Sequence, residues 1–168
     1  MATIIRQPQE CRILVVDDEE KFCELMCSAL KPRYTVTGCL SGKEACSLIG
    51  KNTFDVVVTD LRLSDGSGID VLRSAKKKDP YTEVLLITGY ASFESASLAI
   101  ELGAISYIEK PVKLDDFLAR VEKAVASRLF HCKSLVLMQK TGAMSAEFKD
   151  HLSDITALYY FTRKVTVS

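Results

Sequence analysis

Acidic residues end two short apolar runs of this chain. Asp17 and Asp18 follow the run 13–16, and Asp60 follows the run 54–59. Short runs of Val and Ile that stop at a charge are typical of buried parallel strands, whose carboxyl ends reach solvent. If the two strands are neighbours, three carboxylates converge at one edge of a sheet, and their mutual repulsion requires a cation. We expect Mg2+, which binds oxygen ligands and keeps waters for a phosphate-bearing ligand.

Strand and helix patterns alternate five times over about the first 128 residues. The expected strands are 12–16, 34–39, 54–59, 83–87 and 104–108. Helices are expected between and after them. Ser41 is expected to cap the second helix, with Glu44 completing a capping box and Gly50 closing the helix. The fourth helix is expected at about 91–102, and the fifth begins near Lys113.

This alternation predicts an α/β fold with one five-stranded parallel sheet. Each right-handed crossover must cover a face of the sheet, so helices lie on both faces. Ligands of such sheets bind outside the carboxyl ends of the strands. The residues at those ends are Asp17, Asp18, Asp60, Thr88, Gly89, Glu109, Lys110 and Pro111.

The side chains at this edge can place a phosphoryl group on a carboxylate. A carboxylate nucleophile needs a metal and a fixed cation to balance its own charge and that of the phosphate. Asp60 is the predicted nucleophile, while Asp18 and Asp17 are the predicted Mg2+ ligands, Asp18 directly and Asp17 directly or through water. Lys110 supplies an ammonium group and Thr88 a hydroxyl donor. Each residue alone is typical of a turn, a cap or a surface, but five at successive strand ends favour a site.

The composition gives no sign of a nucleic-acid or membrane partner. Lysine and arginine total 22 against 22 acidic residues, so direct nucleic-acid binding is not expected. No stretch approaches the roughly 20 apolar residues that span a bilayer, and the first residues lack the apolar centre of a signal peptide. We therefore expect a cytoplasmic protein with no membrane attachment, built from one domain and an appendage.

The six cysteines form no CxxC pair. Cys23 and Cys27 lie one helical turn apart and are two potential ligands of a soft metal. The two histidines, His131 and His151, lie far downstream, so a complete tetrahedral site is hard to assemble. The interpretation as small buried residues with free thiols is favoured.

The motifs at the strand ends resemble those of a known family, the receiver domains of bacterial two-component response regulators. The matching segments are 15–19, 60–68, 87–90 and 107–111. The resemblance covers about residues 10–128 and is greatest for receivers of NtrC-type regulators. It implies a flavodoxin-like three-layer sandwich with strand order 2-1-3-4-5.

The resemblance also implies a function. Asp60 accepts a phosphoryl group from a histidine kinase or a phosphotransfer protein, and the backbone carbonyl of Arg62 completes the Mg2+ site. The peptide bond before Pro111 is expected to be cis. Thr88 and Tyr107 match a coupled switch pair that reshapes a surface for a downstream protein target or a homodimer. Such a protein is not an enzyme acting on other substrates, because it catalyses only its own phosphorylation and dephosphorylation.

One position departs from the family pattern. Ser64 stands where proline is usual, so the loop after Asp60 is expected to be looser.

The C-terminal part, residues 129–168, resembles no effector domain and is expected to be a helical extension of a receiver domain at 1–128. In one interpretation the fifth helix continues with heptad spacing, interrupted at Arg128. A further helix is expected from Ser145, with apolar residues on one face. That face either packs on its own domain or contacts another protein, and periodicity does not decide between the two.

Three other functions compete with the phosphoacceptor. A phosphohydrolase with an aspartyl nucleophile needs a second acid two residues later, and Arg62 stands there. A phosphorylation-independent, receiver-like binding module is opposed by the full set of acidic residues, Thr88 and Lys110. A flavin-binding role rests on the fold alone.

Overall fold

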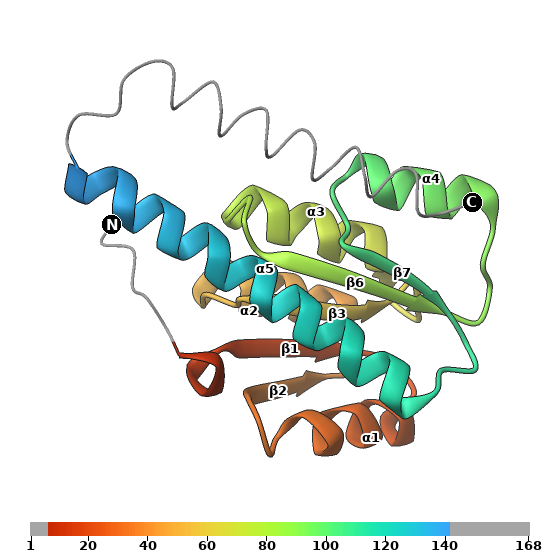
Figure 1. Cartoon of the computed structure of the whole chain (residues 1–168). Helices are drawn as coiled ribbons and strands as arrows, with labels where there is room; N and C mark the ends of the chain where they lie inside the picture. The colour runs from red at the N-terminus through yellow and green to blue at the C-terminus, as the bar shows by residue number, and fades with distance from the viewer. Residues whose placement is uncertain (1–6, 142–168) are drawn as a thin grey trace.

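A parallel five-stranded sheet lies at the centre of the protein (Figure 1). The computed structural model describes residues 7–141, with side chains described to residue 138. The elements in chain order are η1 (Pro8–Glu10), β1 (Arg12–Val16), α1 (Glu20–Leu30), β2 (Thr35–Cys39), α2 (Gly42–Lys51), β3 (Val56–Asp60), β4 (Arg62–Leu63), β5 (Gly66–Ser67), α3 (Gly68–Lys78), β6 (Glu83–Thr88), α4 (Phe93–Glu101), β7 (Ser106–Glu109) and α5 (Leu114–Thr141).

The order of the strands in the sheet is β2-β1-β3-β6-β7, and every pair is parallel. The short strands β4 and β5 form a separate antiparallel hairpin, so the five long strands have the predicted order 2-1-3-4-5. In the register of β1 and β3, Val16 is opposite Thr59. The residues that follow, Asp17 and Asp60, therefore meet at the same edge of the sheet.

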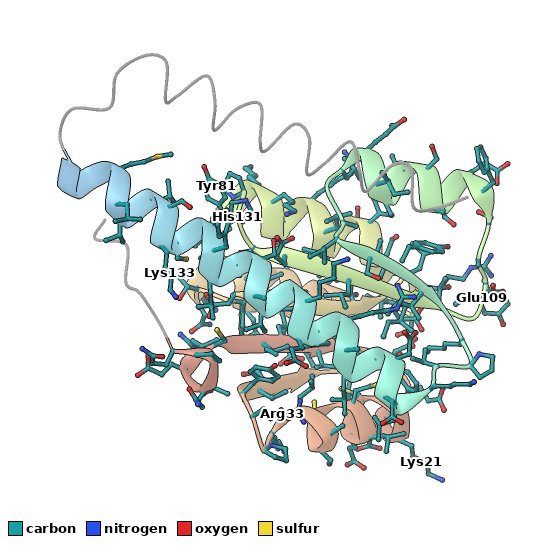
Figure 2. All side chains as sticks on the ribbon, viewed as in Figure 1. Lys21, Arg33, Tyr81, Glu109, His131 and Lys133 are labelled. Carbon is teal, nitrogen blue, oxygen red and sulfur yellow. The ribbon has the colours of Figure 1, made fainter. Side chains whose placement is uncertain are left out.

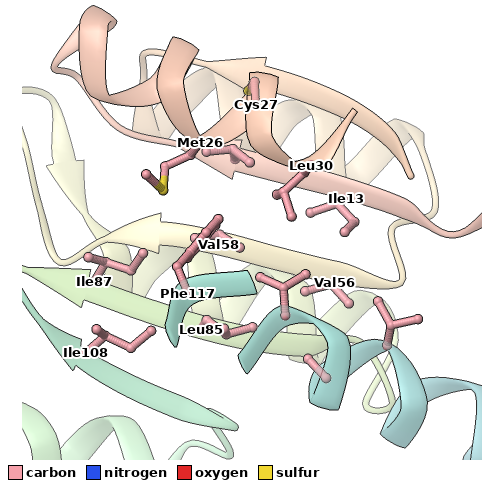
Figure 3. Close-up of a cluster of buried hydrophobic side chains, with 14 of the residues drawn as sticks. Ile13, Met26, Cys27, Leu30, Val56, Val58, Leu85, Ile87, Ile108 and Phe117 are labelled. Atoms are coloured by element: carbon pink, nitrogen blue, oxygen red, sulfur yellow. The ribbon is translucent and has the colours of Figure 1, made fainter. Parts of the chain in front are cut away.

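Helices cover both faces of the sheet, which gives the predicted three layers. The helices α1 and α5 lie on one face, and α2, α3 and α4 lie on the other (Figure 1). Figure 3 shows the core under α1 and α5, where Met26 and Phe117 pack against Val58 of the central strand. The runs of Val, Ile and Leu in the central strands are buried on both faces, as expected of parallel sheets.

The helix boundaries differ from the sequence prediction at two places. Ser41 caps α2 as predicted, since its Oγ accepts a hydrogen bond from the backbone of Glu44 at 3.1 Å. The helix does not end at Gly50, because the chain makes no left-handed turn there and continues to Lys51. The fourth helix begins at Phe93 rather than near 91, because Ser92 is its N-cap.

The fifth helix continues without a break past residue 128 and reaches Thr141. The heptad positions Val121 and Val125 belong to the core under α1 and α5, Leu118 packs against that core, and Cys132 is also buried. The predicted helix from Ser145 lies outside the described residues. No helix within residues 7–141 combines the length and the apolar character that crossing a membrane requires.

Arg128, which interrupts the heptad pattern, has a structural role. Its guanidinium lies 3.2 Å from Asp55 Oδ1 and 2.7 Å from Asp79 Oδ2, at the edge of the sheet where β3 begins. One turn later, His131 lies beside Tyr81, with 5.4 Å between the ring centroids (Figure 2). These contacts fasten the middle of α5 to the loop that enters β6.

All six cysteines are free thiols, and Cys46 is the one that is not buried. Cys23 and Cys27 point from α1 toward Gly38 of β2, where an added Cβ would lie 3.4 Å and 3.0 Å from their sulfur atoms. The interpretation as small buried residues is therefore confirmed for this pair.

Candidate functional site

Three side chains from distant parts of the sequence meet at the carboxyl edge of the sheet. Asp17 follows β1, Asp60 is the last residue of β3, and Lys110 follows β7. The Nζ atom of Lys110 lies 2.9 Å from Asp17 Oδ2 and 2.8 Å from Asp60 Oδ2. The peptide bond between Lys110 and Pro111 is cis, as the resemblance implied. The predicted convergence of carboxylates and ammonium is present.

Burial governs the electrostatics of this group. The side chain of Asp17 is 3% exposed, and its burial raises the pKa although the Lys110 ammonium opposes the shift. Burial lowers the pKa of Lys110, but hydrogen bonds to Asp60 and Asp17 outweigh it, so the net pKa lies above its usual value. The ammonium is therefore charged at neutral pH and attracts anions.

Asp18 contacts the loop that follows the central strand. Its Oδ2 atom accepts a hydrogen bond from the backbone N–H of Ser64 at 2.8 Å. A proline at position 64 has no such N–H to donate. The loop also folds into the β4–β5 hairpin, in which Leu63 pairs with Gly66. The residue that replaces proline therefore joins this loop to Asp18 by a hydrogen bond, and a looser loop stays a prediction.

The backbone around Asp60 is tightly packed. An added Cβ at Gly68 would overlap the carbonyl group of Asp60, so this position requires glycine. The Oδ1 atom of Asp60 accepts a hydrogen bond from the backbone N–H of Arg62 at 3.0 Å. The side chain of Arg62 lies over the ring of Tyr90, 4.2 Å from its centroid. Hydrogen bonds at both carboxylate oxygens thus orient Asp60.

The two predicted switch residues make separate contacts. Thr88 is fully buried, and its Oγ1 atom accepts a hydrogen bond from the backbone of Tyr90 at 3.0 Å. The hydroxyl of Tyr107 lies 2.7 Å from Ser95 Oγ on α4. The ring is therefore fastened to α4 by a contact that the sequence analysis did not predict.

The donor chemistry of this edge fits a magnesium ion. Asp17, Asp18 and Asp60 bring three carboxylates, and Lys110 is the ammonium that contacts two of them. Oxygen donors with excess negative charge suit Mg2+. Among residues 7–138, no three acidic, histidine or cysteine side chains already surround one point. Lys110 lies between two of the donors, and the third is bonded to Ser64.

The comparisons with known proteins agree with this geometry. A family profile described as the response regulator receiver domain matches residues 13–122. This chain belongs to the response regulator receiver family. The match includes every residue predicted for the site, from Asp17 to Lys110.

Curated relatives include regulators with receiver domains. The chain is 36% identical to the transcriptional regulatory protein ZraR of Escherichia coli over 115 residues, or 68% of this chain. It is 35% identical over 119 residues, 70% of this chain, to the response regulator protein PilR of Pseudomonas aeruginosa. Both are NtrC-type regulators, the group that the resemblance favoured. The chain spans 26% of the length of each relative.

Solved receiver domains share the fold. A CheY-like receiver domain protein of Methanospirillum hungatei superposes with a TM-score of 0.69 at 29% identity, over 71% of this chain and 97% of that one. The non-phosphorylated HemR receiver domain of Leptospira biflexa gives a TM-score of 0.65 at 37% identity, over 69% and 94% of the two chains. The α/β fold predicted from the sequence is confirmed.

Proposed function

We propose that Asp60 is the phosphoacceptor of a two-component signalling reaction. One observation carries the proposal: the Lys110 ammonium lies within hydrogen-bonding distance of both Asp60 and Asp17, 2.8 Å and 2.9 Å away. A carboxylate held beside a fixed cation at the carboxyl edge of a parallel sheet is suited to attack a phosphoryl group. Membership of the receiver family supports the same residue.

In the proposed reaction, a carboxylate oxygen of Asp60 forms a bond to phosphorus, and the bond from phosphorus to the donor group breaks. With a phosphohistidine donor, the electron pair stays on the imidazole nitrogen, which takes a proton. The Lys110 ammonium stabilises the negative charge on the phosphoryl oxygens. Hydrolysis of the acyl phosphate by water returns the carboxylate. The chain acts on itself in both steps, and no other substrate is proposed.

We propose Mg2+ as the cofactor, held by Asp17, Asp18, Asp60 and the backbone carbonyl of Arg62. The excess of carboxylates over ammonium supports this assignment. When bound, the ion supplies charge neutralisation for the phosphate and the nucleophile.

Thr88 and Tyr107 are proposed to relay phosphorylation to the surface. In this structure the Thr88 hydroxyl accepts a hydrogen bond from the backbone of Tyr90. A phosphoryl group on Asp60 would attract this hydroxyl away from Tyr90. Displacement of that loop favours inward rotation of the Tyr107 ring and the loss of its bond to Ser95. The surface of α4, β7 and α5 then changes shape for a downstream protein target or a second copy.

The proposed phosphodonor is a histidine kinase or a phosphotransfer protein. Six free thiols support the cytoplasm as the proposed compartment, because a reducing environment keeps them unpaired. We propose a receiver domain at 1–128 and a C-terminal extension at 129–168, joined through α5.

The test is the intact mass after incubation with acetyl phosphate and Mg2+. The expected result is one phosphate adduct that a chelator prevents and that hydroxylamine, which cleaves acyl phosphates, removes. The Asp60→Asn variant is expected to show no adduct. An adduct of equal yield in this variant would contradict the assignment of Asp60.

A further inference from the structure

The Lys110 ammonium has a third neighbour besides its two carboxylates. Its Nζ atom lies 4.1 Å from the centroid of the Phe22 ring, in the first turn of α1. An ammonium group has three N–H donors, and two have oxygen acceptors at Asp17 and Asp60. The π face of the ring receives the remaining side of the cation.

We propose that Phe22 is a positioning residue for phosphoryl transfer, which holds the Lys110 ammonium between Asp17 and Asp60. The inference rests on the proposed function and goes beyond it, because it concerns a residue outside the site predicted from the sequence. Phe22 acts through the lysine, whose ammonium it contacts.

The lysine needs such a support. A lysine side chain is a flexible four-carbon stem that ends in a strongly hydrated charge. The side chain of Lys110 is 20% exposed, so water reaches part of it. An aromatic ring over the ammonium excludes water from one side and limits the positions of Nζ, which strengthens its attraction to the carboxylates.

The ring itself is held in place by α1. Phe22 is partly buried and packs on the core formed under α1 and α5. A leucine at this position retains apolar packing but has no π face, whereas a tyrosine retains both. The two substitutions therefore separate positioning of the ammonium from simple filling of the core.

The experiment compares phosphorylation rates of the native chain with Phe22→Leu and Phe22→Tyr, each alone and combined with Lys110→Ala. We expect Phe22→Leu to slow phosphorylation by acetyl phosphate about fivefold, within the range of a partly screened cation–π contact. The Phe22→Tyr variant should retain the native rate. In the Lys110→Ala background, Phe22→Leu should have no further effect, because the group through which it acts is gone.

A second measurement needs no phosphorylation. The ε-methylene protons of Lys110 should show an upfield ring-current shift in the native NMR spectrum, kept in Phe22→Tyr and lost in Phe22→Leu. A native rate in Phe22→Leu, or an equal loss in the Lys110→Ala background, would overturn the proposal. If the native chain accepts no phosphate, the proposed function has failed. Absence of the ring-current shift instead overturns the placement of Lys110 by Phe22.

Discussion

At each end of the central strands, two aspartates are bridged by one cationic side chain. The cation is a lysine at the carboxyl edge of the sheet and an arginine at the opposite, amino edge. At the carboxyl edge, Lys110 bridges Asp17 and Asp60. At the opposite edge, Arg128 bridges Asp55 and Asp79. Both cations therefore neutralise aspartates at the ends of the same central strand, β3, where Asp55 precedes the strand and Asp60 ends it.

The cation determines what each edge can do. Arginine presents a rigid fork of donors, which suits a permanent connection between α5 and the sheet. Lysine has a compact charge on a flexible side chain, so its ammonium can move toward an anion that binds at this edge. The carboxyl edge also has Asp18, a further carboxylate beyond the bridged pair. The amino edge is thus a structural clamp, and the carboxyl edge is open to ligand chemistry.

The largest predicted effect concerns the clamp. Arg128→Ala removes the guanidinium that bridges the buried carboxylate of Asp55 and that of Asp79, so the free energy of unfolding should fall by about 3 kcal/mol. Urea denaturation followed by circular dichroism measures this change. Lys123→Ala, at an exposed position of the same helix, is the control and should change stability little. An equal fall in both variants would refute a specific clamp.

The next effect concerns the opposite edge. Lys110→Ala should slow phosphorylation by acetyl phosphate about a hundredfold, the cost of removing one electrostatic donor from a transition state. The free energy of unfolding should fall less in Lys110→Ala than in Arg128→Ala. The exposed Lys113 provides the control, since Lys113→Ala removes a nearby positive charge without touching either aspartate. Equal rates in the two variants would contradict the role of the ammonium.

A smaller effect is expected at the loop that contacts Asp18. Ser64→Pro removes the backbone N–H that orients this carboxylate, so Mg2+ affinity measured by calorimetry should fall about tenfold. Ser64→Ala keeps the N–H and should bind Mg2+ like the native chain. A decrease in both variants would instead assign the effect to the lost hydroxyl.

The smallest effect concerns the contact between Tyr107 and α4. Tyr107→Phe removes the hydrogen bond to Ser95 and should lower stability by about 1 kcal/mol, whereas Ser95→Ala should cost more because it also removes the hydrogen bonds of Ser95 Oγ to Ser92. The double variant should lose no more than the larger single loss, since the interaction is shared. Thermal unfolding of the three variants checks this, and additive losses would show that the two hydroxyls act independently.

The carboxyl edge could be predicted from the sequence because its acidic residues end apolar runs. The alternating pattern predicts a parallel sheet, and the strand order that brings Asp17 and Asp60 together is implied by the family resemblance. The clamp could not be predicted in this way. In the sequence Arg128 is an interruption of a heptad, and its partners Asp55 and Asp79 lie 73 and 49 residues away, so the pattern around it gives no sign of them.

Contacts across elements explain the other differences. The stacking of Phe22 on Lys110 joins α1 to the loop after β7, and an apolar residue in a helix predicts only core packing. The hydrogen bond at Ser64 comes from the backbone N–H, so the type of side chain at this position does not predict it. Serine in place of proline at position 64 therefore allows the hydrogen bond between this loop and Asp18.

The most direct test makes the same substitution at both ends of β3. Asp60→Asn and Asp55→Asn are each incubated with acetyl phosphate and Mg2+, and intact mass and urea unfolding are measured. We predict that Asp60→Asn takes no phosphate and remains folded, whereas Asp55→Asn, which loses its charge beside Arg128, takes phosphate and is less stable. Phosphate on Asp60→Asn with none on Asp55→Asn, both folded, would contradict the assignment of chemistry to the carboxyl edge.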